Sequence, residues 1–175
     1  MLEPKRISNK TIRLALEKAL RYRLLNEPAE AESICRDVLL VDPDNRDAAI
    51  TLLLAITDQF ETNFASALEE ANRVSEQIDG EYEQAYYEGI IHERWAKAQI
   101  ARNMPADFAN GWIRKAMSCY EKAEQLGKPD DPDAVLRWNT CARFLNRNQH
   151  STSTSRYTST THDVEASFGD DVPPR

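Results

Sequence analysis

The sequence predicts an all-α protein in which paired helices stack as a solenoid. The 175 residues include only five glycines and 29% charged residues, which is typical of a mostly helical protein. Equivalent small residues recur with a period near 34, since Ala15 and Ala49 lie 34 positions apart and Ala49 and Ala85 lie 36 apart. No segment alternates between apolar and polar residues for long enough to indicate a strand, so we expect no sheet.

Apolar spacing and turn residues divide the chain into seven expected helices. Pro28 is well placed to open the second helix, because a proline is tolerated in the first turn. Asp44 or Asn45 is expected to cap the third helix and Thr62 the fourth. The expected helices cover approximately residues 9–25, 28–41, 45–60, 62–78, 82–102, 105–126 and 131–147.

The composition changes beyond Asn148. The segment 150–175 holds ten serines and threonines, only scattered apolar residues and a Pro-Pro pair near its end. Such a segment buries too little apolar surface to offset the entropy of ordering. We therefore expect a helical repeat domain over residues 1–148 and a disordered Ser/Thr-rich tail over 149–175.

The charge distribution argues against nucleic acid as the main partner. The net charge is −7, with +5 over residues 1–25 and −11 over residues 26–146, whereas phosphate binding needs a concentrated basic face. The chain has neither an apolar run long enough for a membrane span nor the apolar stretch of a secretion signal. Three cysteines within helical patterns indicate core residues of a reduced, cytoplasmic protein.

Two strings place small and bulky residues at the spacing of packed helices: Ala116-x3-Tyr120-x2-Ala123, and Trp138-x2-Cys141-Ala142-x2-Leu145. An upstream string, Ala31-x3-Cys35-x2-Val38-x4-Pro43, has the same form. Over residues 12–147 the chain resembles the tetratricopeptide repeat (TPR) family. The resemblance implies a right-handed α-solenoid of about three TPR helix pairs plus a C-terminal capping helix.

The third unit departs from the family pattern because it is too long. Ala85 and Trp138 are 53 residues apart, about 19 more than the family period, so we expect an elongated third hairpin. Its expected apolar seam is formed by Trp95, Ile100, Met104, Phe108 and Trp112. These side chains either hold the two long helices together, which we favour, or form a second docking surface.

The resemblance implies that the first helix of each pair lines a concave groove. Carried over by position, the expected partner-binding residues are Leu16, Leu20, Arg23, Ile50, Leu54, Tyr86 and Ile90. Charged residues expected at the groove edges include Arg13, Asp47, Asp58, Glu83 and Glu93. An apolar centre differs from the Lys/Asn-rich pattern with which chaperone-clamp TPR domains hold acidic peptides. It favours an amphipathic helix or an extended apolar segment of a partner.

We therefore expect a non-enzymatic adaptor or small chaperone, similar in architecture to the secretion chaperones of bacterial type III systems. One alternative is a structural TPR protein that forms homo-oligomers. Another is that the Ser/Thr tail is the functional element, either as a modifiable tether or as a segment that folds back into the groove. A basic N-terminal face is formed by Arg6, Lys10, Arg13 and Arg21. We favour a solvated helix face over a site that docks an acidic protein surface or anionic lipid.

Catalytic motifs and cofactor motifs are missing from the sequence. It has no glycine-rich phosphate loop, no Gly-x-Ser-x-Gly turn and no His-Glu-x-x-His zinc motif. Glu88 and His92 lie four positions apart on one helix face, but two ligands do not make a metal site. We therefore expect no enzyme activity, no cofactor and no metal.

Overall fold

The computed structural model describes residues 2–127 and 130–158, and within these ranges every regular element is helical. A short 3-10 turn, η1 (Asn9–Thr11), leads into the first α-helix. The α-helices are α1 (Ile12–Leu24), α2 (Pro28–Leu39), α3 (Arg46–Asp58), α4 (Phe64–Ser75), α5 (Glu81–Ala101), α6 (Ala106–Leu126) and α7 (Asp133–Thr158). The predicted all-α class is confirmed.

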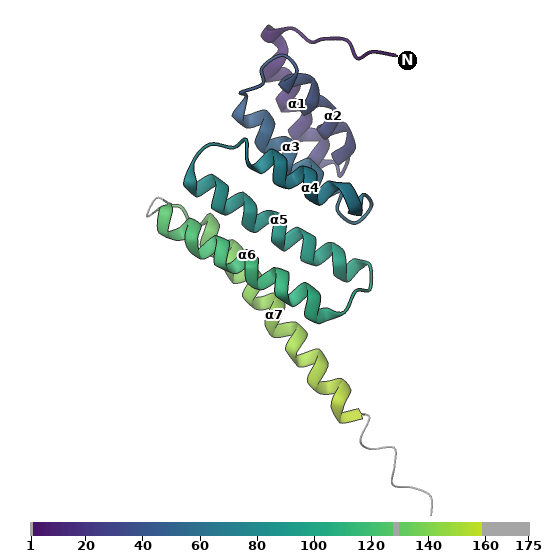
Figure 1. The fold of residues 1–175 in the computed structure, drawn as a ribbon, viewed down its shortest axis with the longest axis vertical. Helices are drawn as coiled ribbons and strands as arrows, with labels where there is room; N and C mark the ends of the chain where they lie inside the picture. Colours follow the sequence, from purple (N-terminus) through teal and green to yellow (C-terminus); the bar gives the residue numbers. More distant parts are fainter. Residues whose placement is uncertain (1, 128–129, 159–175) are drawn as a thin grey trace, which may run out of the picture.

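The helices stack in chain order from α1 and α2 at one end to α7 at the other (Figure 1). Each helix packs against the next one along the chain. In addition, α1 contacts α3 and α3 contacts α5. The odd-numbered helices α1, α3 and α5 therefore form one continuous layer, and side chains from all three can meet on it.

The observed helix ends follow local chemistry. Pro28 occupies the first turn of α2, as predicted. The side-chain oxygen of Asn45 accepts a 2.9 Å hydrogen bond from the backbone N–H of Ala48 and so caps α3, also as predicted. The prediction for Thr62 is wrong, because α4 begins one residue later, after Asn63, and the Thr62 hydroxyl donates to the carbonyl of Gln59 instead.

The turn into α5 depends on Gly80. This residue precedes the first residue of the helix and has a φ of +105°, a conformation that side chains with a Cβ rarely adopt. A glycine at this point lets the chain leave α4 and reverse into α5 without backbone strain.

Two large groups of buried apolar residues form the core. One joins α1 through α5 and includes the fully buried Ala19, Cys35 and Leu53. The other joins α5, α6 and α7. Leu54 and Trp112 are partly buried and pack against both groups, so the two groups form one continuous core.

The hairpin of α5 and α6 is the longest pair, with 21 residues in each helix against 12 or 13 in α1 to α4. Trp95 is buried, and Ile100 and Trp112 pack partly buried against the core, as expected for an apolar seam. Met104 and Phe108 differ from the prediction, since they are 44% and 61% exposed. Met104 lies in the turn between the two helices, and Phe108 lies in the first turn of α6.

Helix α7 continues to Thr158, past the expected end near Arg147. No glycine or proline occurs between Pro132 and Gly169, so no residue stops the helix where the composition becomes polar. The remainder of the predicted tail, residues 159–175, lies outside the described residues. Among the described helices, none combines the length and the apolar character needed to cross a bilayer.

Candidate functional site

The predicted partner-binding residues lie on the three helices of the odd-numbered layer. On α1, Leu20 follows Leu16 by one turn and Arg23 follows Leu20 by three residues. On α3, Leu54 follows Ile50 by one turn. Residues three and four apart share a helix face, so each helix presents these side chains as one row. Because α1 and α3 are in contact, the two rows lie side by side.

Four of these apolar residues form what we call the α1–α3 face: Leu16, Leu20, Ile50 and Leu54. Leu20 is 47% exposed, and the other three are half-buried. Ile50 and Leu54 pack their inner sides against the core. Part of each side chain thus stabilises the fold, and the remainder is apolar surface that another molecule can cover.

Ile90 is not available to a partner in this structure. It is only 2% exposed and belongs to the buried group between α5, α6 and α7. The long α6 and the packed α7 cover this part of α5, so a position that the repeat pattern assigns to an open face lies in the core instead.

Tyr86 is half-buried within a group of aromatic rings. Its ring stacks on Tyr82 at 5.8 Å between centroids and meets Tyr87 edge-on at 5.3 Å. Its side chain also interacts electrostatically with Arg137 of α7. Tyr86 therefore forms a boundary of the accessible apolar surface and does not extend it.

The other end of the α1–α3 face is bounded by an ion cluster of Arg23, Asp58 and Arg94. Arg23 donates to one carboxylate oxygen of Asp58 at 2.8 Å, and Arg94 pairs with the other at 2.7 Å. Arg94 also donates to the carbonyl of Leu54 at 2.9 Å. The ion cluster therefore connects α1, α3 and α5 directly through side chains.

Sequence reasoning placed Arg23 and Asp58 near the groove but missed Arg94. The signal that could have found Arg94 is its position 36 residues after Asp58, which is one observed repeat spacing. Burial lowers the pKa of Arg94 from its usual value, yet an arginine remains charged near neutral pH.

A second charged group surrounds Glu93, which is 1% exposed. We call it the Glu93 network: its carboxylate accepts from the Tyr120 hydroxyl at 2.7 Å and from Lys97 at 2.5 Å, and Arg137 lies 3.6 Å away. Burial, together with the adjacent carboxylate, raises the pKa of Tyr120, which keeps the phenol protonated as the donor. The network joins α5, α6 and α7.

The ion cluster and the Glu93 network together carry an excess of positive charge. They contain four cations, Arg23, Arg94, Lys97 and Arg137, and two carboxylates, Asp58 and Glu93, in a chain whose net charge is −7. These two groups are therefore locally basic on an acidic protein. The ion cluster, which adjoins the α1–α3 face, favours a ligand with an apolar side and some negative charge.

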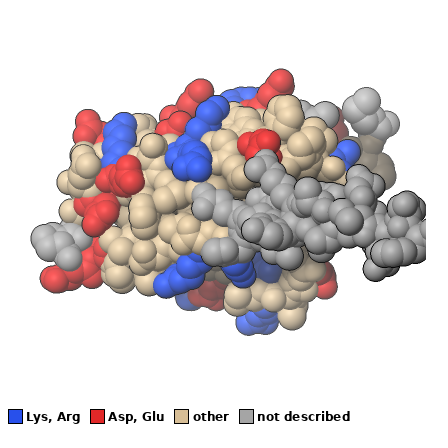
Figure 2. All heavy atoms as spheres, turned by 90° about the horizontal axis from the view of Figure 1, so that it is seen from below, with Lys and Arg blue, Asp and Glu red and all other residues tan. Residues whose placement is uncertain are grey.

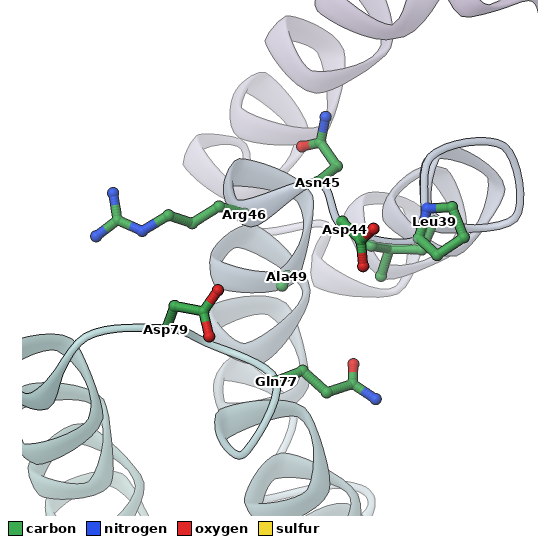
Figure 3. A pocket seen from close by; sticks show the side chains of 8 residues that line it. Leu39, Asp44, Asn45, Arg46, Ala49, Gln77 and Asp79 are labelled. Carbon is green, nitrogen blue, oxygen red and sulfur yellow. The ribbon is translucent and has the colours of Figure 1, made fainter.

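A hollow of about 610 Å3 lies apart from the α1–α3 face. Its walls come from the α2–α3 turn, the start of α3 and the α4–α5 connection (Figure 3). Asp44 and Asp79 line it, while the Arg46 side chain extends away from the others and pairs with Glu83. These groups do not form a nucleophile, base and orienting partner in the manner of a catalytic site.

The surface charge near the α7 end is mixed. Figure 2 shows the molecule from below Figure 1, with acidic and basic side chains interspersed and separated by uncharged surface. Where described residues form this face, they lack the single-sign basic field that a nucleic acid backbone requires.

Comparisons with known proteins add no assignment. No protein-family model matches the chain, and neither the curated proteins nor the solved structures include a match.

Proposed function

We propose that the protein is a non-enzymatic interaction module of the TPR type that binds an apolar or amphipathic segment of a partner protein. The partner covers the α1–α3 face, and the protein acts as a cytoplasmic adaptor or small chaperone. The observation that supports this proposal best is the row of partly exposed leucine and isoleucine side chains next to a locally basic ion cluster.

A TPR-like solenoid is supported by the pattern of helix contacts. Consecutive helices pack together, and α1–α3 and α3–α5 contacts join the first helices of successive pairs. In a right-handed solenoid of this kind the first helices form the inner wall, which is the surface that repeat proteins use for binding. The α1–α3 face belongs to that wall.

The chemistry of the surface favours an amphipathic helix that carries acidic residues beside its apolar side. Covering about 300 Å2 of apolar surface would contribute roughly 7 kcal/mol at 25 cal/mol per Å2, before the costs of association and ordering. Acidic side chains of the partner would then meet Arg23 and Arg94, which share the single carboxylate of Asp58.

Leu20→Glu tests this surface directly. The change places a carboxylate on a side chain that is already 47% exposed, so we expect the helical fold to persist. Binding of a fluorescently labelled amphipathic peptide, leucine-rich on one side and acidic beside it, should weaken about tenfold or more. Fluorescence anisotropy measures the affinity, and circular dichroism checks the fold.

Leu40→Glu is the matched control, because Leu40 is 60% exposed and lies at the end of α2, outside the odd-numbered layer. The Leu40→Glu variant should bind this peptide with the same affinity as the unmodified protein. Equal affinity of Leu20→Glu and Leu40→Glu for every peptide of a panel with varied charge would show that the α1–α3 face is not the binding site.

Self-association is the alternative function, and the open end of the stack favours it. Helix α1 and its C-cap expose Leu14 at 51%, Leu24 at 88% and Leu25 at 60%. Apolar surface at the end of a helical array is a natural contact between copies. Static light scattering over a range of concentrations distinguishes the two functions: a dimer that Leu14→Glu dissociates supports self-association, whereas a monomer at all concentrations removes it.

A further inference from the structure

The long hairpin brings together three metal-ligating side chains of different types. Glu88 and His92 lie four residues apart on one face of α5, and Cys119 faces them from α6. One ligand atom from each residue lies within 4.8 Å of the other two. Only the fold supplies the third ligand, because Cys119 is 27 residues from His92 in the sequence.

The spacing of the atoms fits a tetrahedral zinc ion. The Cys119 sulfur and the His92 Nδ1 are 3.7 Å apart. Zinc bonds of about 2.3 Å to sulfur and about 2.0 Å to nitrogen, at the tetrahedral angle, hold these two atoms roughly 3.5 Å apart. Glu88 is exposed, so a change of its rotamer can bring a carboxylate oxygen to the third position.

The cluster is also accessible. It lies between two hollows that both include Glu88 and His92 in their walls. The hollow on the α6 side has a volume of about 570 Å3 and is also lined by Ser118 and Cys119. A metal ion can therefore enter from solvent, and space remains for a water molecule or a partner's side chain as a fourth ligand.

The protonation state of His92 suits metal binding, whereas Cys119 must lose a proton. Burial lowers the pKa of His92, so the imidazole is neutral near pH 7 and its lone pair can bind a metal. Burial and the neighbouring Glu88 raise the pKa of Cys119 to about 11, so without metal the residue is a thiol. Metal binding then releases the thiol proton to solvent and forms the metal–sulfur bond.

Lys115 and Arg114 line the same hollow and oppose a cation. The Lys115 ammonium, however, lies over the Trp112 ring, 4.3 Å from its centroid, and is held there by the aromatic face. A thiolate and a carboxylate around Zn2+ give a neutral centre, which limits the repulsion from these two side chains.

We propose that Glu88, His92 and Cys119 form a zinc site that links α5 to α6, with its fourth position open. This inference is independent of the proposed function, since the three residues lie outside the α1–α3 face. A neutral histidine, a thiolate and a carboxylate are the ligand types that Zn2+ prefers, and an open fourth position allows a partner to complete the coordination.

The test uses the full chain, reduced with a phosphine and freed of metal, and titrated with Co2+ as a spectroscopic substitute for zinc. We expect one equivalent of Co2+ to bind with a thiolate-to-cobalt charge-transfer band, and Zn2+ to displace it. Cys119→Ser should abolish the band, and Glu88→Gln or His92→Gln should weaken Zn2+ binding about tenfold or more in a chelator competition.

Cys35→Ala is the matched control, because Cys35 is a buried thiol of α2 and is not one of the three proposed ligands. Its substitution should leave the charge-transfer band unchanged. Circular dichroism confirms that each variant is folded. Zn2+ should also raise the thermal midpoint of the unmodified protein and of Cys35→Ala, but not of Cys119→Ser. A band that persists in Cys119→Ser, or the absence of stoichiometric binding, would overturn the proposal and leave a thiol–imidazole hydrogen bond.

Discussion

Glu93 is a charged residue that is buried in the core. A buried carboxylate is costly unless its oxygens are satisfied by hydrogen bonds and by opposite charge. Here Tyr120, Lys97 and Arg137 supply both, from α6, from the next turn of α5 and from α7. The arrangement explains why a charged residue on α5 is buried at a place where the repeat pattern expects a groove edge.

We expect Tyr120→Phe to lower the free energy of unfolding by about 2 kcal/mol, because a buried carboxylate loses one of its donors. Urea unfolding followed by circular dichroism measures the change. Tyr82→Phe is the matched control: the Tyr82 hydroxyl donates to Asp131 at 3.3 Å in an exposed setting, and its removal should cost less than about 1 kcal/mol. Equal losses in the two variants would contradict a special role for the Tyr120–Glu93 contact.

At the scale of the element, the α5–α6 hairpin depends on one close approach. The Tyr120 ring packs directly on the backbone of Gly89, and a Cβ at Gly89 would lie 2.6 Å from a ring carbon of Tyr120. The absence of a side chain at Gly89 lets α6 pack against the backbone of α5. The Tyr120 ring occupies the space that a side chain at residue 89 would fill, and the two long helices can therefore pack closely.

Gly89→Ala should therefore destabilise the protein, by about 1–3 kcal/mol, since Tyr120 is fully buried and cannot move aside. Gly111→Ala is the contrasting variant on the partner helix α6, where a Cβ meets nothing within 4 Å. That change should stabilise the protein by about 0.5–1 kcal/mol, because alanine favours a helix over glycine. Thermal or urea unfolding measures the stability of both variants. A loss of stability in both would mean that helix propensity does not determine the effect of Gly111→Ala.

For the whole molecule, the stack is a linear array in which each helix depends on its neighbours. The ion cluster adds a side-chain connection across α1, α3 and α5 that does not depend on chain order. Its central carboxylate, Asp58, is 26% exposed, so its pairs are worth more than those of a fully solvated surface charge.

Asp58→Asn tests this connection. The change leaves Arg23 and Arg94 facing each other without a counter-charge. We therefore expect the substitution to increase the rate at which backbone amides of α1 exchange with solvent, and to increase it more in α1 than in α7. Hydrogen exchange read by mass spectrometry localises the effect. Glu17→Gln removes the Arg13–Glu17 pair within α1, whose side chains are 80% and 54% exposed, and should leave exchange unchanged. A uniform increase over all helices after Asp58→Asn would indicate global destabilisation instead.

Much of the fold could be predicted from local signals. Pro28 and Asn45 act where the helix rules place them, because a first-turn proline and a capping side chain depend only on adjacent backbone. Thr62 is not the cap because its hydroxyl bonds back to Gln59 and α4 begins after Asn63, whose side chain makes no capping hydrogen bond. The end of α7 was misplaced because a polar composition weakens a helix but does not stop it.

The candidate site was less predictable. Repeat spacing assigned Leu20 and Leu54 to two helices, α1 and α3, that are in contact, but it could not show that α6 and α7 cover Ile90. It also could not identify Arg94 as the partner of Asp58, or Cys119 as the neighbour of His92, since both pairs join different helices.

By itself, the sequence determined where helices form and which of their faces are apolar, because capping, backbone freedom and helical periodicity act over a few residues. Only the tertiary structure decided which apolar positions remain accessible and which charged or metal-ligating side chains meet. Those outcomes depend on how helices that are distant in the chain pack against one another, and that packing is set by the whole core.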